Sequence, residues 1–186
     1  MKAGKLRRRR FLQAGATAAA AAATVSCGGV KSPWRYLSPE QARTLEAMCE
    51  QIIPADRDPG AREAGVVHFI DRQLTGFHRQ FRDAYRIGLP ALNETSRQLH
   101  GAAFAEIPWD RQTAVLRSIE SATAGGAHWQ GTSPADFFSL VVAHTMQGFY
   151  GSPRHGGNRE AASWRMLGVP DPPVRGQAQY DLTKKG

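Results

Sequence analysis

The sequence predicts an all-α protein, with a single compact domain of five or six helices after an N-terminal export signal. Beyond residue 37, apolar residues recur at spacings of three and four, as the buried face of an amphipathic helix requires. No stretch alternates apolar and polar residues between closely spaced turn signals, so no β-sheet is expected. The roughly 160 residues after the signal are enough to bury one core.

The first helix is expected to begin at Ser38 and to end before Pro54. Ser38 can accept hydrogen bonds from first-turn amides, Pro39 suits the first helical position, and Gln41 completes a capping box. Cys49 lies on the apolar stripe of this helix, so it is expected to be a small buried side chain rather than a nucleophile. The other residues of the stripe are Ala42, Leu45, Met48, Ile52 and Ile53.

Two further helices are expected over residues 61–74 and 77–99. On the flank of the first, His68 and Asp71 are three residues apart and are expected to form a solvated pair rather than a site. The second contains Pro90, which should kink or divide it because proline removes one backbone donor. The apolar residues that predict the two helices are Val66, Val67, Ile70 and Leu74, and then Phe77, Phe81, Tyr85, Leu89 and Leu92.

A fourth helix is expected over residues 109–122, entered through Ile107-Pro108. A fifth follows the capping residue Ser133, and a short sixth, capped by Asn158, runs toward Trp164. The fifth helix is the most apolar, so it should lie in the middle of the bundle. Its apolar residues are Phe137, Phe138, Leu140, Val141, Val142 and Met146.

The N-terminus has the plan of an export signal over residues 1–26. An arginine run stands before an alanine-rich apolar stretch that is too short for a convincing membrane span. Paired arginines before a weakly apolar core are typical of the twin-arginine route, which exports folded proteins. The alternative is a basic, disordered terminus with an accidental alanine run. The residues that carry the prediction are Arg7, Arg8, Arg9, Arg10, Phe11 and Leu12.

Most of the basicity of the chain belongs to this signal. The full chain has 24 Lys and Arg against 16 Asp and Glu, a formal net charge of +8. Six of the basic residues and none of the acidic ones lie in residues 1–26, so the remainder has a net charge of +2. Nucleic-acid binding is therefore not expected, and the four tryptophans have no basic stripe beside them.

Residues 27–37 are expected to link the signal to the helical domain, 38–186, which ends in a proline-rich tail. Cys27 follows Thr24-Val25-Ser26, which loosely resembles the end of a lipoprotein signal. Acylation of Cys27 would hold the domain on a membrane face, and an unmodified Cys27 would leave it unanchored. With only two cysteines, the chain has no disulfide framework.

No cofactor or catalytic motif is found in the sequence. Phosphate-binding, dinucleotide-binding, haem-attachment, iron–sulfur, zinc-protease and nucleophile-elbow patterns are absent. His144 lies on the apolar fifth helix, where a hydrogen-bonded interior histidine is the expected role. A metal site formed by His128, His144 and His155 is the enzymatic alternative, and no spacing in the sequence supports it.

Several short segments, in order along the chain, carry a resemblance to a known family. They are LSPEQ (37–41), IIPAD (52–56), PGAREAGVV (59–67) with FID (69–71), and GFYG (148–151) with GGNR (156–159). Over nearly the whole mature chain the sequence resembles the small subunit, subunit 3 or gamma, of the membrane-associated gluconate 2-dehydrogenase family. Pro90 and Pro108-Trp109 depart from the smoother helices expected of that family.

The resemblance implies a non-catalytic subunit whose partner is a large flavoprotein. Together with the export signal and the missing cofactor motifs, it leads to the hypothesis that the chain supports assembly and export of that flavoprotein. That partner would hold FAD and oxidise gluconate or another sugar or polyol, and a third subunit would be a cytochrome c with its haem. The chain would pass the twin-arginine translocon with the flavoprotein and lie at the periplasmic face of the inner membrane. The alternative is a free-standing periplasmic or lipid-anchored helical binding protein.

The glycine-rich loop after the fifth helix, with the proline-rich tail, is the expected partner surface. Glycines allow backbone shapes that other residues resist, and an obligate partner needs a large complementary area. An ordinary helix–loop–helix connection is the alternative. The residues predicted to form the surface are Phe149, Tyr150, Gly151, Arg154, His155, Gly156, Gly157, Asn158, Arg159 and Trp164.

Overall fold

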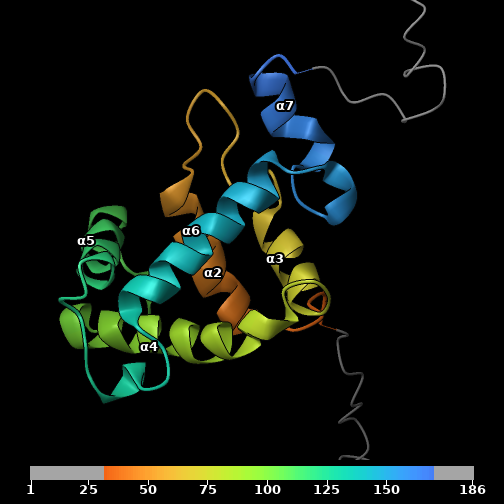
Figure 1. The fold of residues 1–186 in the computed structure, drawn as a ribbon. Helices are drawn as coiled ribbons and strands as arrows, with labels where there is room; N and C mark the ends of the chain where they lie inside the picture. Colours follow the sequence, from red (N-terminus) through yellow and green to blue (C-terminus); the bar gives the residue numbers. More distant parts are fainter. Residues whose placement is uncertain (1–31, 170–186) are drawn as a thin grey trace, which may run out of the picture. The chain divides into compact units, whose positions relative to one another are not determined.

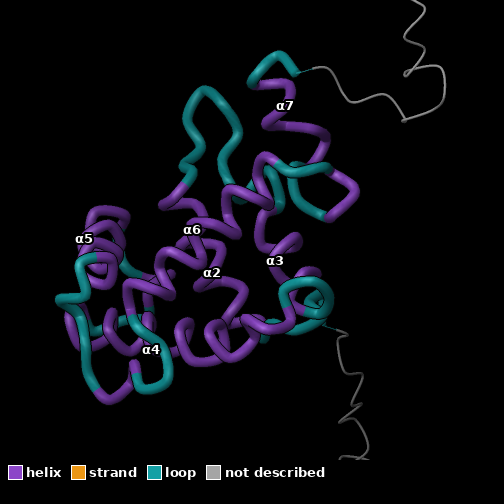
Figure 2. Tube along the Cα trace, viewed as in Figure 1, coloured by secondary structure: helices purple, strands orange, loops and turns teal. Residues whose placement is uncertain are grey.

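A computed structural model describes residues 32–169 of the chain (Figure 1). This part consists of α-helices and short 3₁₀ turns joined by loops, and it contains no β-strand (Figure 2). The predicted all-α class is confirmed. Within residues 32–169, none of the helices combines the length and the apolar character that a membrane crossing requires. The six α-helices described are α2 (Pro39–Ile52), α3 (Val66–Leu74), α4 (Arg82–His100), α5 (Trp109–Glu120), α6 (Pro134–Tyr150) and α7 (Ala162–Met166).

The two predicted caps of α2 and α6 are confirmed. The Ser38 hydroxyl accepts a hydrogen bond from the Gln41 amide at 3.1 Å, and the Gln41 side chain accepts one from the Ser38 amide at 2.9 Å. At the start of α6, the Ser133 hydroxyl accepts from the Asp136 amide at 3.3 Å. Both helices have proline in the first turn, where no backbone donor is needed.

The next two helices begin later than their apolar spacing predicts. Residues 61–65 form turns, so α3 begins at Val66. Turns over residues 75–78 and the 3₁₀ turn η1 (Arg79–Phe81) separate α3 from the following helix, which begins at Arg82. The expected inward position of Phe77 is wrong, because 80% of its surface is exposed in that turn.

Pro90 does not divide the third predicted helix. Of the two expected effects, a kink or a division, the division is wrong, because α4 runs from Arg82 to His100 as one helix. Pro90 lies on the exposed side of α4. On that side, the carbonyl group that loses its donor can be hydrated, which lowers the cost of proline inside the helix.

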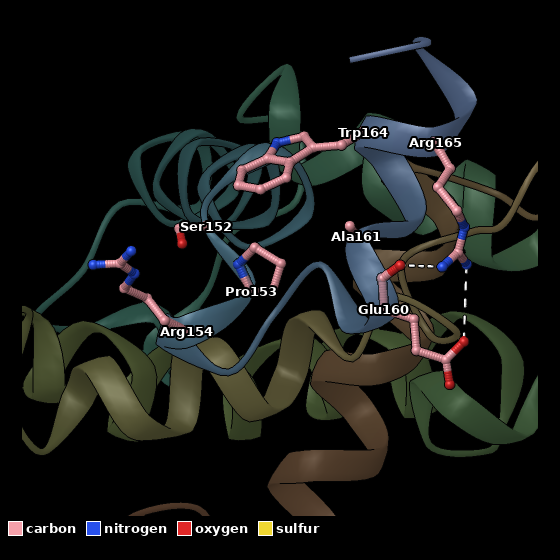
Figure 3. Close-up of a pocket in the computed structure, with 7 residues that line it drawn as sticks. All are labelled: Ser152, Pro153, Arg154, Glu160, Ala161, Trp164 and Arg165. Atoms are coloured by element: carbon pink, nitrogen blue, oxygen red, sulfur yellow. Dashed lines mark hydrogen bonds and ion pairs between the residues drawn. The ribbon is translucent and has the colours of Figure 1, made fainter. Parts of the chain in front are cut away.

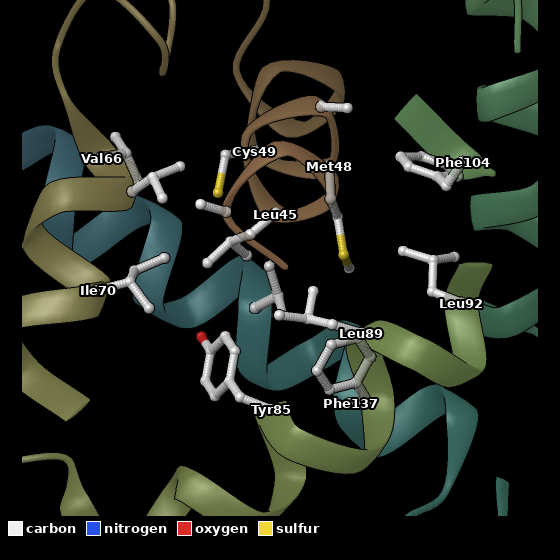
Figure 4. Close-up of a cluster of buried hydrophobic side chains, with 14 of the residues drawn as sticks. Leu45, Met48, Cys49, Val66, Ile70, Tyr85, Leu89, Leu92, Phe104 and Phe137 are labelled. Atoms are coloured by element: carbon white, nitrogen blue, oxygen red, sulfur yellow. The ribbon is translucent and has the colours of Figure 1, made fainter. Parts of the chain in front are cut away.

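Helix α6 lies in the middle of the bundle, as its apolar sequence predicts. It contacts each of the other five described α-helices. Side chains from α2, α3, α4 and α6 meet in one cluster (Figure 4). The largest of the fully buried side chains include Tyr85, Phe104, Phe137, Phe149, Leu45 and Met48.

Cys49 is buried in this cluster, which confirms the structural role predicted for it. Burial raises the pKa of the Cys49 thiol to about 12. The Thr145 hydroxyl donates a hydrogen bond to the sulfur at 3.3 Å. A thiol with so high a pKa stays protonated and is a poor nucleophile.

Asp71 anchors the segment that precedes the first helix. Its buried carboxylate accepts hydrogen bonds from the backbone amides of Arg35, Tyr36 and Leu37, at 2.7, 2.9 and 2.9 Å. The expected solvated pair with His68 is therefore wrong, and the His68 ring stacks on Trp34 at 4.7 Å instead. The last residues of the predicted linker are part of the folded domain, because hydrogen bonds from their amides satisfy a buried carboxylate.

Candidate partner interface

The loop between α6 and α7 frames an open hollow at the surface (Figure 3). The loop contains two short 3₁₀ turns, η4 (Pro153–His155) and η5 (Arg159–Ala161), which contact each other, and η5 leads directly into α7. The hollow has a volume of about 470 Å³ and lies where the sequence predicts a partner surface. It is lined by Ser152, Pro153, Arg154, Glu160, Ala161, Trp164 and Arg165.

Asn158 holds the loop in shape from the inside. Its side chain is fully buried and donates a hydrogen bond to the Gly151 carbonyl at 2.9 Å. Its oxygen accepts from the Ser163 amide in the first turn of α7, also at 2.9 Å. The prediction that Asn158 is the capping residue of the sixth helix is corrected, because the 3₁₀ turn η5 intervenes and the N-cap residue of α7 is Ala161. The neighbouring Gly157 must be glycine, since a Cβ there would collide with the Gly148 carbonyl oxygen.

Three of the non-glycine residues in this loop adopt left-handed backbone conformations. The φ angles of Asn158, Glu160 and Ala161 are 45°, 55° and 54°. Such values are uncommon outside glycine and are retained where the surrounding structure imposes them. Here the Arg159 amide donates to the Ala64 carbonyl at 3.0 Å, which ties the loop to the segment before α3. The hollow therefore has a defined shape in the isolated chain.

Trp164 and Tyr150 join the hollow to the end of α6. Trp164 is half-buried, and its indole nitrogen donates a hydrogen bond to the Tyr150 carbonyl at 3.0 Å. This hydrogen bond fixes the orientation of the indole ring. Tyr150 leaves 39% of its surface exposed, and its ring packs edge-on against Phe149 at 4.9 Å. Two aromatic side chains with little freedom left to lose are therefore available to a partner.

The structure divides the predicted interface residues into two groups. The side chains of Tyr150, Arg154, His155 and Arg159 are exposed, and Gly151, Gly156 and Trp164 are half-buried. Phe149, Gly157 and Asn158 are buried, so their prediction as contact residues is corrected: they shape the loop from within. Their prediction as contact residues follows from assigning the glycine-rich loop to the partner surface as a whole, because the sequence does not show which of its residues face inward.

Two arginine side chains are among the residues that line the hollow. Arg154 and Arg165 lie on opposite sides of it (Figure 3). Arg165 pairs with the Glu160 carboxylate at 3.8 Å and also donates to the Glu160 carbonyl. From α3, Arg72 donates to the Arg154 carbonyl at 3.0 Å. Sequence reasoning did not single out Arg72, Glu160 or Arg165, although the arginine content of the segment was a usable signal.

The histidines of the proposed metal alternative are not brought together. His144 is buried and hydrogen-bonded through Nδ1 to the Tyr85 hydroxyl at 2.8 Å, which confirms its predicted interior role. His128 Nε2 is bonded to the Thr95 hydroxyl at 3.0 Å, whereas His155 is exposed in η4. Among residues 32–169, no three His, Cys, Asp or Glu side chains are grouped as metal ligands would be.

Some of the predicted sites lie outside the described residues. They are the arginine run Arg7–Arg10 with Phe11 and Leu12, the candidate acylation site Cys27, and the proline-rich tail from residue 170.

Comparison with known proteins identifies the family. No curated protein and no solved structure matches the chain. The family model for gluconate 2-dehydrogenase subunit 3 matches residues 39–170, which include every described helix and the loop around the hollow. Because this match spans well over half of the sequence, the chain belongs to the gluconate 2-dehydrogenase subunit 3 family.

Proposed function

We propose that this chain is the non-catalytic small subunit of a membrane-associated, FAD-dependent dehydrogenase of gluconate or another sugar or polyol. In this role it binds the large flavoprotein subunit and supports its assembly and twin-arginine export. A cytochrome c subunit, where present, takes the electrons onward. Family membership supports the assignment to a dehydrogenase complex, and the arginine run before the apolar segment supports the export role.

One observation carries the interface part of the proposal. The loop after α6 keeps three non-glycine residues in left-handed conformations and presents a half-buried tryptophan beside arginines. Tryptophan and arginine are the residue types that most often dominate protein–protein binding energy. In this proposal FAD lies in the partner chain, and the solvent-open hollow is a contact surface for that chain.

The first experiment captures the partner with the full-length chain from its native extract and records the absorbance spectrum of the complex. A yellow complex with flavin bands and a large second chain is expected. A colourless single chain, from an extract known to contain the flavoprotein, would instead favour a free-standing periplasmic or lipid-anchored binding protein.

The export role is tested by placing lysine at all four positions of the arginine run. Replacing single arginines is uninformative because the run from Arg7 to Arg10 is redundant. The expected result is that both the small subunit and the active flavoprotein remain in the cytoplasm. Export of active flavoprotein despite the four lysines would refute the escort role.

The interface is tested with Tyr150→Ala and Trp164→Ala. Both changes should weaken capture of the flavoprotein more than they lower the melting temperature of the full-length small subunit. Trp109→Ala is the matched control, since Trp109 is exposed at the start of α5 and belongs to a different surface. If the two interface variants chiefly lose stability, the aromatic residues serve the fold and the loop is a plain connection.

A further inference from the structure

The outer face of α6 is an exposed and nearly uncharged helix surface. The 17 residues of α6 include one charged side chain, Asp136. A helix at the surface of a globular protein ordinarily carries charged and polar residues on its solvent side. In Figure 1, α6 crosses in front of α2, and no described helix covers it in that view. Met146, on this outer face, leaves 44% of its surface exposed, and Tyr150 continues the face at the end of the helix.

Side-chain sizes on this face suit the packing of a second helix. Ala135, Ser139 and Ala143 recur every four residues, and the latter two are exposed. They form a row of small side chains that ends at the exposed, polar Gln147, beside a row of larger apolar ones. Helices pack by fitting the four-residue ridge of one into such a groove of the other. The larger row consists of Phe138, Val142, Met146 and Tyr150.

The charged residues at one end of this face indicate which charge a binding partner carries there. The hydrogen bond from Trp164 to the Tyr150 carbonyl joins the outer face of α6 to the arginine-rimmed hollow. Within residues 32–169, the exposed guanidinium of Arg154 makes no ion pair, and Arg165 has a single, exposed partner at 3.8 Å. A complementary partner is therefore uncharged along α6, with apolar side chains against Ala143, Met146 and Tyr150, and acidic where it reaches these arginines.

We propose that an apolar helix of the flavoprotein subunit packs along the outer face of α6, with acidic side chains against Arg154 and Arg165. This inference rests on the proposed function, because it identifies the occupant with the flavoprotein partner. It goes beyond that function by assigning the central contact to α6, with the hollow at its end. An uncharged core with a charged rim is the usual anatomy of a stable protein–protein interface.

The test places a charge in the middle of the row of small side chains. Ala143→Glu adds a carboxylate at an exposed helical position where glutamate is well tolerated by the helix. It should weaken capture of the flavoprotein by the full-length chain at least tenfold while leaving the melting temperature of the chain nearly unchanged. Ala114→Glu on α5 is the matched control, because the same substitution is made at another exposed helical alanine. This control should bind as the wild type does.

Arg154→Glu supplies a second readout at the end of the face. It should weaken capture and reduce the loss of binding that added salt causes in the wild type, because one charge-assisted contact is removed. Loss of capture by Ala143→Glu but not by Ala114→Glu, together with this change in salt dependence, supports the proposal.

Three results would overturn the proposal. If Ala143→Glu and Ala114→Glu both capture the flavoprotein normally, the outer face of α6 is not the docking surface, although the proposed function stands. If Ala143→Glu instead converts a dimer of this chain to a monomer and capture is intact, a second copy occupies the face. If the wild type captures no flavoprotein, the proposed function fails first and this inference fails with it.

Discussion

Protonation of His144 should make the stability of this protein fall in mild acid. His144 lies in α6 with 2% of its surface exposed. Burial, and then the charge of His78, lower the pKa of His144 to about 4. Three groups face the His144 ring. The hydroxyl of Tyr85 in α4 lies 2.8 Å from its Nδ1 atom. The His78 ring stacks on it with a centroid distance of 4.2 Å, and the Phe81 ring lies edge-on with a centroid distance of 5.2 Å.

The sign and size of the effect follow from proton linkage. In the unfolded chain the pKa of His144 returns to about 6.5. Between these two pKa values the unfolded state binds more protons than the folded state, so the free energy of unfolding falls as the pH falls. The gap from about 6.5 to about 4 corresponds to roughly 3 kcal/mol, which is fully lost only below the folded pKa. Above about pH 6.5, His144 is neutral in both states and does not lower the free energy of unfolding.

The assay is urea unfolding of the full-length chain at a series of pH values from 8 to 4. His144→Asn removes the titrating ring and should have lower stability at pH 8, but a flatter decline between pH 6.5 and 4 than the wild type. His155→Asn changes an exposed histidine and should keep the wild-type profile. If His144→Asn and the wild type lose the same free energy over this range, buried His144 is not the group responsible.

Two further predictions concern residues that hold the fold. Gly88→Ala should lower the melting temperature, because a Cβ there would lie 2.5 Å from Cε2 of the buried Phe137 ring. The destabilisation from overpacking, about 1–3 kcal/mol, is expected to exceed the stabilisation of about 1 kcal/mol that alanine gives a helix relative to glycine. An increase in melting temperature would contradict this prediction. Asp71→Asn should lower the free energy of unfolding by about 2–3 kcal/mol in urea titrations, since an amide places a donor against three backbone amides. A change of less than about 0.5 kcal/mol would show that the N-terminal segment does not depend on this carboxylate.

Much of the fold could be predicted because its signals are local. The starts of α2 and α6 follow from a serine cap and a first-turn proline, which act within a few residues whatever the rest of the chain does. The central position of α6 follows from its composition, since an apolar helix is stabilised by contacts with several neighbours, and α6 contacts each of the other five described α-helices. The family could be identified from short ordered segments, and the family model confirms it.

The tertiary structure alone decided which residues of the candidate interface are available to a partner. Phe149 and Tyr150 are adjacent aromatic residues, but the rotation of α6 against the core buries the first and exposes the second. Arg72 is brought to the loop at Arg154 across 82 positions of sequence, which no local pattern encodes. The nearly uncharged outer face of α6 could not be predicted from its composition either, because hydrophobic content shows that a helix packs but not on how many sides. Caps and periodicity act through neighbours in the chain, whereas exposure depends on elements far apart in the sequence.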